Sequence, residues 1–418
     1  MRGEIIAIGD ELTSGRIINS TSCFAAAKLF AAGCELRILS TIGDDPALII
    51  ATLRQALARS GFIIVTGGLG ATSDDLTNEA VCRALGRTLV FYPEVLRKIQ
   101  ANSHHLSAQA RTALEKLAWL PNGAHALHSE ARSTGYFLVD QGKPAFFLPG
   151  VPHEMRALLV DAVLPRLAVW ENQPPLQIRQ RLYRVSGLNE DEINRRLAEL
   201  EHCDLRVRIG YYPVYPEVQV SLTIRAAAAV TATEADALLD RFDAEIKHLL
   251  GRNIYGLAED SLEEVVGGLC RDRGLSLAVA ESCSGGLIAA AITRVPGSSV
   301  YFRAAVVAYH NELKESLLKV KSATLATHGA VSAAVAREMA IGARRISGAD
   351  LALSATGIAG PGGGSSEKPV GTVFIGLSAR AKTLAEPCFF TGNRQQIQAS
   401  TAHRALDLLR RFLLADQD

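Results

Sequence analysis

The chain has 418 residues, of which 44 are Lys or Arg and 43 are Asp or Glu, so its formal net charge is +1. A chain of this length is expected to form two or three domains, because a single hydrophobic core stops growing at roughly 250–300 residues. The near-neutral charge and the absence of a long Lys/Arg run remove any electrostatic argument for tight nucleic-acid binding. Small-molecule chemistry is therefore the better starting hypothesis.

The cysteines are scattered, odd in number and never spaced as Cys-x-x-Cys. They are Cys23, Cys34, Cys82, Cys203, Cys270, Cys283 and Cys388. This pattern argues against a disulfide framework or a structural zinc site and for a reducing compartment. The first residues do not form a signal-peptide pattern, and no apolar stretch is long enough to cross a bilayer. We therefore expect a cytoplasmic protein with no membrane partner.

Short apolar runs alternate with amphipathic segments in the first part of the chain. The alternation predicts a mainly parallel sheet covered by helices on both faces. Ligands of such sheets bind beyond the carboxyl ends of the strands. The expected elements are strands at 4–8, 36–40 and 62–66, helices at 25–32 and 46–60, and a later helix at 155–167.

Three loops at these strand ends carry candidate ligand-binding residues, and we expect them to line one crevice. The candidates for nucleotide binding are Gly9, Asp10, Glu11, Gly67, Gly68, Gly70, Thr72, Pro149 and Gly150. Backbone N–H groups of the glycine-rich turn suit a pyrophosphate, and Asp74 and Asp75 suit a hydrated divalent cation, with Glu154 arriving from the third loop. An oxygen-rich set favours magnesium or manganese over zinc. Helix capping is the other explanation for the paired acids.

A polar, proline-rich stretch at 171–175 is the expected linker to a small α+β module. No catalytic cluster is evident in this module. Its expected elements are strands at 180–185 and 217–225 and helices at 190–200 and 232–250. Ser261 and Glu264 then have the spacing of a capping box that opens the last part of the chain.

In the last part, an apolar run ends at Ser282 and resumes as a second apolar stretch after two glycines. A strand that ends in a tight turn at a helix start would hold Ser282 where backbone N–H groups converge, which suits an acyl-transfer nucleophile. A helix cap is the alternative role for this serine. Cys283 is a rival nucleophile that ranks lower, because a lone cysteine at a packed turn is usually a small buried hydrophobe.

Two further strand ends in this part carry Tyr309 with Lys314 and the glycine-rich run 356–364. A partly buried lysine beside a tyrosine loses its proton readily and can activate a serine hydroxyl. The glycines permit close approach of a phosphate, and Arg394 at the start of the final helix is a candidate clamp for an anionic group. A solvated lysine, a core tyrosine and a surface turn are the alternatives.

These motifs together resemble the CinA family over nearly the whole chain. The segments that resemble its molybdopterin-binding-type first domain are 9–11, 14–17, 66–70, 74–77 and 148–152. The segments that resemble its C-terminal amidohydrolase domain are 280–283, 307–309, 311–314, 356–361 and 368–373. The part between them is similar to the family's KH-type domain. The resemblance implies domains at 1–170, 171–256 and 257–418, with two three-layer α/β/α domains joined by a small α+β domain.

The resemblance implies that the last domain deamidates nicotinamide mononucleotide (NMN) to nicotinate mononucleotide and ammonia without a cofactor. Ser282 would be the nucleophile, activated by Lys314 and Tyr309. The implied substrate-binding residues are Cys283, Ser284, Thr356, Gly357, Gly360, Gly362, Gly363 and Arg394. The first domain would be a metal-dependent pyrophosphatase acting on ADP-ribose, so both activities would serve pyridine nucleotide salvage. A homodimer is also implied, and the neutral charge leads us to expect no direct nucleic-acid binding.

The sequence departs from the family pattern at six positions. Ser284, His310 and Gly362 stand where Thr, Ser and Asp are common, and they leave every presumed catalytic group in place. Ala71, Ser73 and Thr21 replace the usual Pro, Lys and Asn of the first domain. Loss of a cation beside bound phosphates weakens the pyrophosphatase assignment. The alternatives are a first domain that holds a nucleotide or pterin without cleaving it, and a non-catalytic interaction protein linked to competence or DNA damage.

Overall fold

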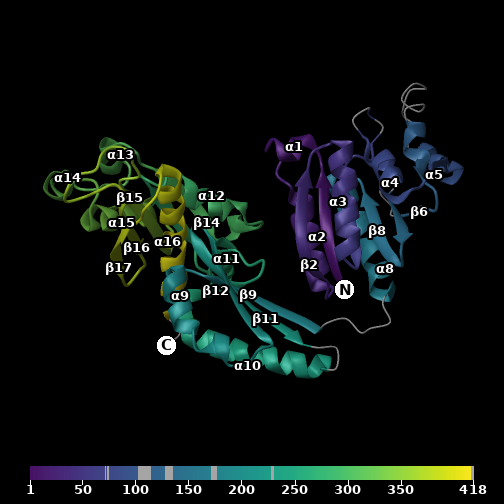
Figure 1. The fold of residues 1–418 in the computed structure, drawn as a ribbon. Helices are drawn as coiled ribbons and strands as arrows, with labels where there is room; N and C mark the ends of the chain where they lie inside the picture. The colour runs from purple at the N-terminus through teal and green to yellow at the C-terminus, as the bar shows by residue number, and fades with distance from the viewer. Residues whose placement is uncertain are drawn as a thin grey trace. The chain divides into compact units, whose positions relative to one another are not determined.

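The computed structural model describes residues 1–70, 72, 75–101, 114–127, 135–170, 177–226 and 230–415. The chain divides into two units, Met1–Arg179 with Arg225–Asp236, and Gln180–Ile224 with Ala237–Asp418. Figure 1 shows the elements of both units along the chain. Among the described residues, no helix is both long enough and apolar enough to cross a membrane.

The first unit contains a six-stranded sheet in the order β2-β1-β3-β8-β7-β6. The first four strands of this order are parallel, whereas β7 and β6 run antiparallel to their neighbours. The sheet is therefore mixed: its first four strands are parallel, as expected, and an antiparallel pair lies at one edge. Its strands are β1 (Arg2–Ile8), β2 (Glu35–Ile42), β3 (Phe62–Thr66), β6 (His125–Ala126), β7 (Tyr136–Asp140) and β8 (Lys143–Leu148), and a separate pair is β4 (Leu89–Phe91) with β5 (Trp119–Pro121).

Helices cover both faces of this sheet, because alternate residues of each buried strand point to opposite sides. Ile5 and Phe146 lie in one core with α2 and α7, while Ile6 and Phe147 lie in another core with α3 and α4. The helices are α1 (Asp10–Thr13), α2 (Ser20–Ala31), α3 (Pro46–Arg59), α4 (Thr77–Leu85), α5 (Pro93–Ala101), α7 (Pro152–Leu158) and α8 (Leu164–Trp170), with a π-turn, η2 (Leu159–Val163), between the last two.

A four-stranded antiparallel sheet, in the order β10-β11-β9-β12, forms the middle module together with α9 and α10. Its strands are β9 (Gln177–Val185), β10 (Val207–Val214), β11 (Glu217–Ala226) and β12 (Ile254–Leu257), and its helices are α9 (Glu190–Leu197) and α10 (Ala232–Leu250). Tyr183 and Val220 pack against Phe242 and Ile246 of α10 on one face of the sheet. The expected linker at 171–175 lies outside the described residues.

The last part contains a five-stranded mixed sheet in the order β14-β13-β15-β16-β17, in which only the first three strands are parallel. The strands are β13 (Leu277–Glu281), β14 (Phe302–Val307), β15 (Leu351–Gly357), β16 (Thr372–Ser378) and β17 (Thr383–Phe389). The helices are α11 (Leu262–Asp272), α12 (Leu287–Arg294), α13 (Asn311–Ser316), α14 (Ser322–His328), α15 (Ala333–Ser347) and α16 (Arg394–Ala415).

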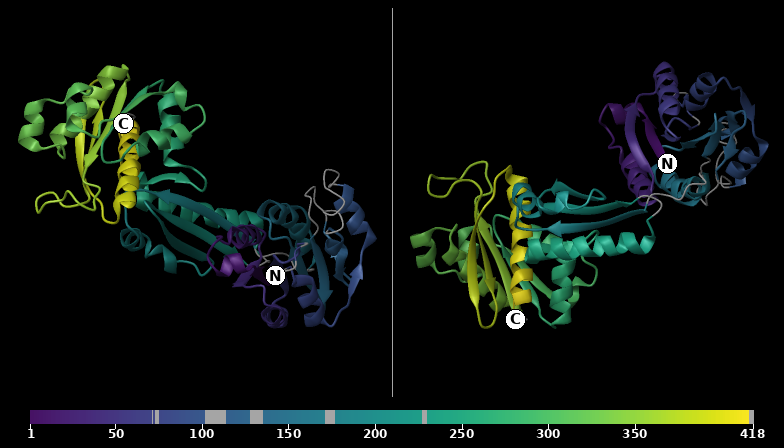
Figure 2. Two further views of the ribbon diagram at one scale, coloured as in Figure 1. Left: turned by 90° about the horizontal axis from the view of Figure 1, so that it is seen from above. Right: turned by 60° about the horizontal axis from the view of Figure 1, so that its bottom comes forward.

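This sheet also has helices on both faces. Val279 of β13 shares a core with α11, α12 and α16, whereas its neighbours Ala278 and Ala280 pack against Met339 of α15. Figure 2 shows α16, in yellow, alongside the strands of this sheet. The predicted capping box is confirmed, because Ser261 and Glu264 exchange hydrogen bonds at the start of α11. The fold class, α/β with a small α+β middle module, is confirmed.

Candidate functional site

The strand ends of the C-terminal sheet surround a cavity of about 280 Å³. Every predicted site residue of this part except Ser284 lines it. The lining residues are Ser282, Cys283, Tyr309, Asn311, Lys314, Ala330, Val331, Thr356, Gly357, Ile358, Ala359, Gly360, Gly362, Gly363 and Arg394. Ser284 is fully buried and does not line the cavity, and its hydroxyl has no hydrogen-bond partner among the described residues. The three loops predicted to form one pocket do form one.

Ser282 directly follows β13, and its backbone N–H donates to the Ala355 carbonyl of the neighbouring strand at 2.9 Å. The expectation that helix N–H groups converge on this serine is not met. The buried Glu281 carboxylate accepts from the N–H groups of Gly286, Ile288 and Ala289 at 2.9, 3.1 and 2.9 Å. Glu281 therefore satisfies the start of α12, which begins five residues beyond Ser282, and fixes the turn that carries Ser282.

Lys314 on α13 is 2% exposed, which is unusual for a lysine. Its Nζ donates to the carbonyls of Ala308 at 2.9 Å and Tyr309 at 3.2 Å. Burial lowers the pKa of Lys314 below its usual 10.5, because a charged amine is disfavoured away from water. The structure therefore gives this pocket an amine that releases its proton more easily than an ordinary lysine.

Tyr309 and Arg394 form a pair at the mouth of the cavity. Tyr309 is 58% exposed, and its hydroxyl accepts from an Arg394 guanidinium nitrogen at 2.5 Å. The other terminal nitrogen of Arg394 donates to the Gly360 carbonyl at 2.7 Å. Arg394 therefore joins the tyrosine to the glycine-rich loop, and its charge lies where the sequence predicted a clamp for an anionic group.

Cys283 is the rival nucleophile, and it lies in an unfavourable environment for thiolate chemistry. The side chain is 5% exposed, and burial raises the pKa of its thiol to about 12. With this pKa, the thiol stays protonated near neutral pH. The reactive form of a cysteine is the thiolate. A buried, protonated thiol is a poor nucleophile, so Ser282 stays the predicted one.

Sequence reasoning missed two sets of residues at this cavity. Gln398, one helical turn after Arg394, donates to the Cys283 carbonyl at 3.0 Å. Thr356 Oγ1 donates to the Ala330 carbonyl at 2.8 Å, which brings the segment before α15 to the pocket wall. The i, i+4 spacing of Arg394 and Gln398 places both side chains on one face of the helix, and it could have predicted the Gln398 contact. No local pattern marks Ala330.

A second cavity, of about 440 Å³, lies at the carboxyl ends of β1, β3 and β8 in the first unit. The expectation of one crevice lined by three loops is met here. The predicted residues that line it are Gly9, Glu11, Gly67, Gly68, Gly70, Asp75, Pro149, Gly150 and Glu154. Asp10 and Thr72 are not among its lining residues. Thr21 and Asp44, which the prediction did not include, are.

The glycine-rich loop approaches other backbone too closely for larger residues. Gly67 has φ +99°, and a Cβ there would lie 2.1 Å from the Ile8 carbonyl oxygen. A Cβ on Gly70 would lie 2.3 Å from an Asp75 carboxylate oxygen. The loop is further tied by Lys116, whose ammonium donates to the Thr72 carbonyl. Lys116 is a cation beside this loop that the sequence did not reveal.

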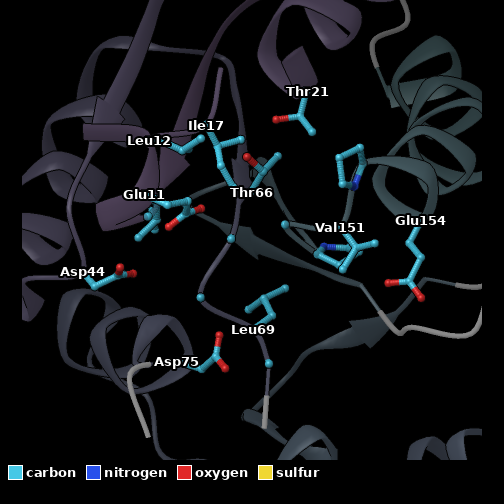
Figure 3. Close-up of a pocket in the computed structure, with 18 of the residues that line it drawn as sticks. Glu11, Leu12, Ile17, Thr21, Asp44, Thr66, Leu69, Asp75, Val151 and Glu154 are labelled. Carbon is cyan, nitrogen blue, oxygen red and sulfur yellow. The ribbon is translucent and has the colours of Figure 1, made fainter. Parts of the chain in front are cut away.

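The acidic side chains of this cavity are spread around it. Figure 3 shows Asp44, Asp75 and Glu154 on different sides of the cavity instead of converging on one point. Asp10 and Asp44 exchange bonds, each backbone N–H donating to the other carboxylate at 2.9 and 3.2 Å. In the ranges described, no three His, Cys, Asp or Glu side chains form a group that could hold a metal ion. Asp74 lies outside the described residues.

Family models match three successive parts of the chain. The matches are "Probable molybdopterin binding domain" over 4–169, "Damage-inducible protein CinA KH domain" over 180–256 and "CinA C-terminal domain" over 259–413.

Full-length relatives and solved structures are also similar to this chain. A CinA-like protein of Desulfotalea psychrophila is 48% identical, with 99% of each chain covered. A putative competence-damage inducible protein of Caldicellulosiruptor saccharolyticus is 37% identical over 99% of this chain and 100% of its own. A solved CinA superfamily protein of Klebsiella pneumoniae 700603 is 33% identical and covers 37% of this chain and 99% of its own, with a TM-score of 0.36. The chain belongs to the CinA family.

Proposed function

We propose that the C-terminal cavity hydrolyses nicotinamide mononucleotide to nicotinate mononucleotide and ammonia. The observation that carries this proposal is the buried amine of Lys314, with its lowered pKa, in the same cavity as Ser282. A serine hydroxyl is a weak nucleophile until a neighbouring base removes its proton. Lys314 supplies such a base without a histidine or a carboxylate.

In the first half of the reaction, the neutral amine of Lys314 accepts the proton of Ser282 Oγ while Oγ attacks the amide carbon. The C–N bond then breaks, and Lys314 returns the proton to the departing nitrogen, which leaves as ammonia. In the second half, water attacks the acyl carbon and passes its proton through Lys314 to Ser282 Oγ. The ester bond breaks, nicotinate mononucleotide is released and both side chains return to their starting states.

Arg394 and the glycine-rich loop supply the contact for the nucleotide's phosphate. A guanidinium binds phosphate oxygens through parallel N–H bonds, and glycines let backbone approach the anion. The Tyr309 hydroxyl keeps Arg394 at the mouth of the cavity, so this tyrosine acts on the phosphate end of the substrate in addition to its predicted part in activating Ser282.

The experiment that tests this proposal measures ammonia and nicotinate mononucleotide after incubation of the purified chain with nicotinamide mononucleotide. Nicotinamide riboside, which lacks the phosphate, is the comparison substrate and should give a much higher KM. Cys283→Ala tests the rival nucleophile, because ammonia release that persists in this variant excludes the buried thiol as the attacking group. Absence of ammonia from the mononucleotide with folded protein would overturn the proposal.

The kcat of deamidation is expected to rise with pH and to level off above the pKa of Lys314. At low pH the amine is protonated and cannot accept the Ser282 proton. Because burial lowers this pKa, the rise should be complete below the usual lysine value of 10.5. The measurement is kcat against pH, with a pH-jump control for stability. A rate that falls as pH rises through this range contradicts the role of Lys314.

We also propose that the first unit binds a pyrophosphate-bearing nucleotide such as ADP-ribose in its larger cavity. The observation that favours this proposal is the glycine-rich loop. Thr77 anchors the loop, because its hydroxyl donates to the Gly67 carbonyl at 3.1 Å. The described carboxylates form no group that could hold a metal ion, so metal-dependent cleavage stays a prediction.

Titration of ADP-ribose with and without magnesium, read for both binding and release of adenosine monophosphate, separates holding from hydrolysis in this cavity. Binding without release under any divalent metal supports a nucleotide-holding domain. Release that requires the metal supports the pyrophosphatase. Lack of binding in every condition overturns both.

A further inference from the structure

One helix, α16, carries contacts to the C-terminal cavity and to the middle module. At its start, Arg394 donates to the Gly360 carbonyl and to the Tyr309 hydroxyl. One turn later, Gln398 donates to the carbonyl of Cys283, the residue after Ser282. The first two turns of α16 therefore make three hydrogen bonds to residues that line the cavity.

The middle module contacts these same turns. Tyr215 lies between β10 and β11, and its hydroxyl donates to the Gln396 carbonyl at 2.9 Å. It also lies within hydrogen-bond distance of Ser400 Oγ. Tyr215 is not one of the residues that line the cavity, so any effect it has on the site passes through α16.

The contact continues along the helix. The His403 ring nitrogen Nε2 pairs with the Ser186 hydroxyl at 3.0 Å, and Arg410 donates to the Arg252 carbonyl at 2.6 Å. Both partners belong to the middle module's loops, outside its strands and long helices. The module therefore touches α16 on at least three turns, of which only the first is near the cavity.

The start of a helix frays readily, because its first N–H groups have no partner within the helix. In α16 two reciprocal bonds secure it. Asn393 Oδ1 accepts from the Gln396 N–H at 3.0 Å, and Gln396 Oε1 accepts from the Asn393 N–H at 2.8 Å. Tyr215 adds a bond to the carbonyl of the same Gln396, between Arg394 and Gln398. A hydroxyl from another module thus completes the fixing of this turn.

We propose that Tyr215 is a positioning residue of the C-terminal site, through which the middle module holds Arg394 and Gln398 in place. The inference rests on the proposed function of that site. In this proposal the middle module contributes a contact that the deamidase site needs. Loss of the hydroxyl loosens the first turn of α16 and weakens the grip of Arg394 on the phosphate, while Ser282 and Lys314 stay in place.

The test is Tyr215→Phe, which keeps the ring and removes only the hydroxyl, in the full chain. The KM for nicotinamide mononucleotide should rise about five-fold, the effect of one ordinary hydrogen bond, with kcat almost unchanged. The thermal midpoint should fall by no more than about 2–4 °C, the shift that loss of about 1 kcal/mol gives in a domain of this size. Tyr212→Phe is the matched control, since Tyr212 is 51% exposed on β10, and it should leave KM unchanged.

Hydrogen exchange of the amides of 396–400 is the second readout, and it does not depend on activity. These amides should exchange faster in Tyr215→Phe than in the wild type and in Tyr212→Phe. If the wild type deamidates the mononucleotide and Tyr215→Phe has the wild-type KM, the positioning role is wrong and the function stands. If the wild type is inactive, the function is wrong, and unchanged exchange at 396–400 then overturns the contact's role as well.

Discussion

Ser282→Ala is expected to lower the kcat for ammonia release by at least about 10⁴-fold, the scale on which hydrolases lose activity with their nucleophile. The variant removes the only atom that forms the acyl bond, and Lys314 is left without a proton to accept. Since Ser282 is only partly buried and its backbone bond to Ala355 does not involve the side chain, the fold should be unaffected. The measurement is ammonia release under saturating substrate, with circular dichroism to verify folding.

Two comparisons make the result specific to the side chain. Substrate binding, measured by calorimetry, should persist in Ser282→Ala, because the proposed phosphate contacts of Arg394 and the glycine-rich loop are intact. Any ADP-ribose binding by the first unit should be unchanged. A folded Ser282→Ala protein that still releases ammonia at the wild-type rate would show that another group attacks the amide.

Asp407→Ala is expected to destabilise the second unit by about 3–5 kcal/mol, the usual cost of removing one partner from a buried ion pair. Asp407 is fully buried on α16 and accepts from Arg410 at 2.9 Å, Arg411 at 2.8 Å and Arg404 at 2.9 Å. Arg410 is itself only 2% exposed. The variant leaves this guanidinium buried without its counter-charge.

Circular dichroism and tryptophan fluorescence can separate this effect from a general loss of stability. Both tryptophans, Trp119 and Trp170, lie in the first unit, so the fluorescence transition should stay in place while the dichroism transition moves to lower denaturant. Asp407→Asn is a milder second variant for the case in which alanine prevents folding. Asp240→Ala is the control. Asp240 is largely exposed and forms an ion pair with Arg181 at 3.5 Å, so its loss should lower the free energy of unfolding by less than about 1 kcal/mol. Equal effects of the two alanine variants contradict the burial argument.

The pH dependence of this cluster follows from the same contacts. Burial alone would raise the pKa of Asp407, but Arg410 and Arg411 outweigh it and hold the pKa below its usual 3.8. A carboxylate with a lowered pKa in the folded state contributes stability above its unfolded pKa and loses it as pH falls through the folded value. The contribution of Asp407 should therefore be complete at neutral pH and disappear only below pH 3.8.

Local patterns in the sequence predicted the elements well. The strand at 62–66, the helix over 232–250 and the capping box of Ser261 and Glu264 appear with the bounds or bonds expected. These features depend on residues within a few positions of each other, which a single sequence displays directly. The sequence does not display strand direction in this way. β16 runs antiparallel to β15 and β17, and β7 runs antiparallel to β8 in the first unit, although their side chains resemble those of the parallel strands.

The candidate sites were predictable to the extent that they lie on strand ends. Ser282, Lys314 and Arg394 come from three separate segments, and the alternation of strands and helices was enough to bring them to one edge of a sheet. Partners reached over long sequence distances were not predictable. Gln398, for example, donates to the Cys283 carbonyl, which is 115 residues away. The nearer Glu281 carboxylate was not predicted either, and it occupies the helix start where N–H groups were expected to converge on Ser282.

That carboxylate also determines how salt acts on the C-terminal site. Because Glu281 neutralises the positive end of α12, the charged side chain at the cavity mouth that can attract an anion is Arg394. The guanidinium of Arg394 at the cavity mouth is screened within a Debye length of about 8 Å at physiological ionic strength, whereas the neutral amine that the proposed mechanism requires of the buried Lys314 carries no charge to screen. Capture of the proposed nucleotide substrate should therefore weaken with rising ionic strength through one side chain, while the proposed proton transfer inside the cavity should not.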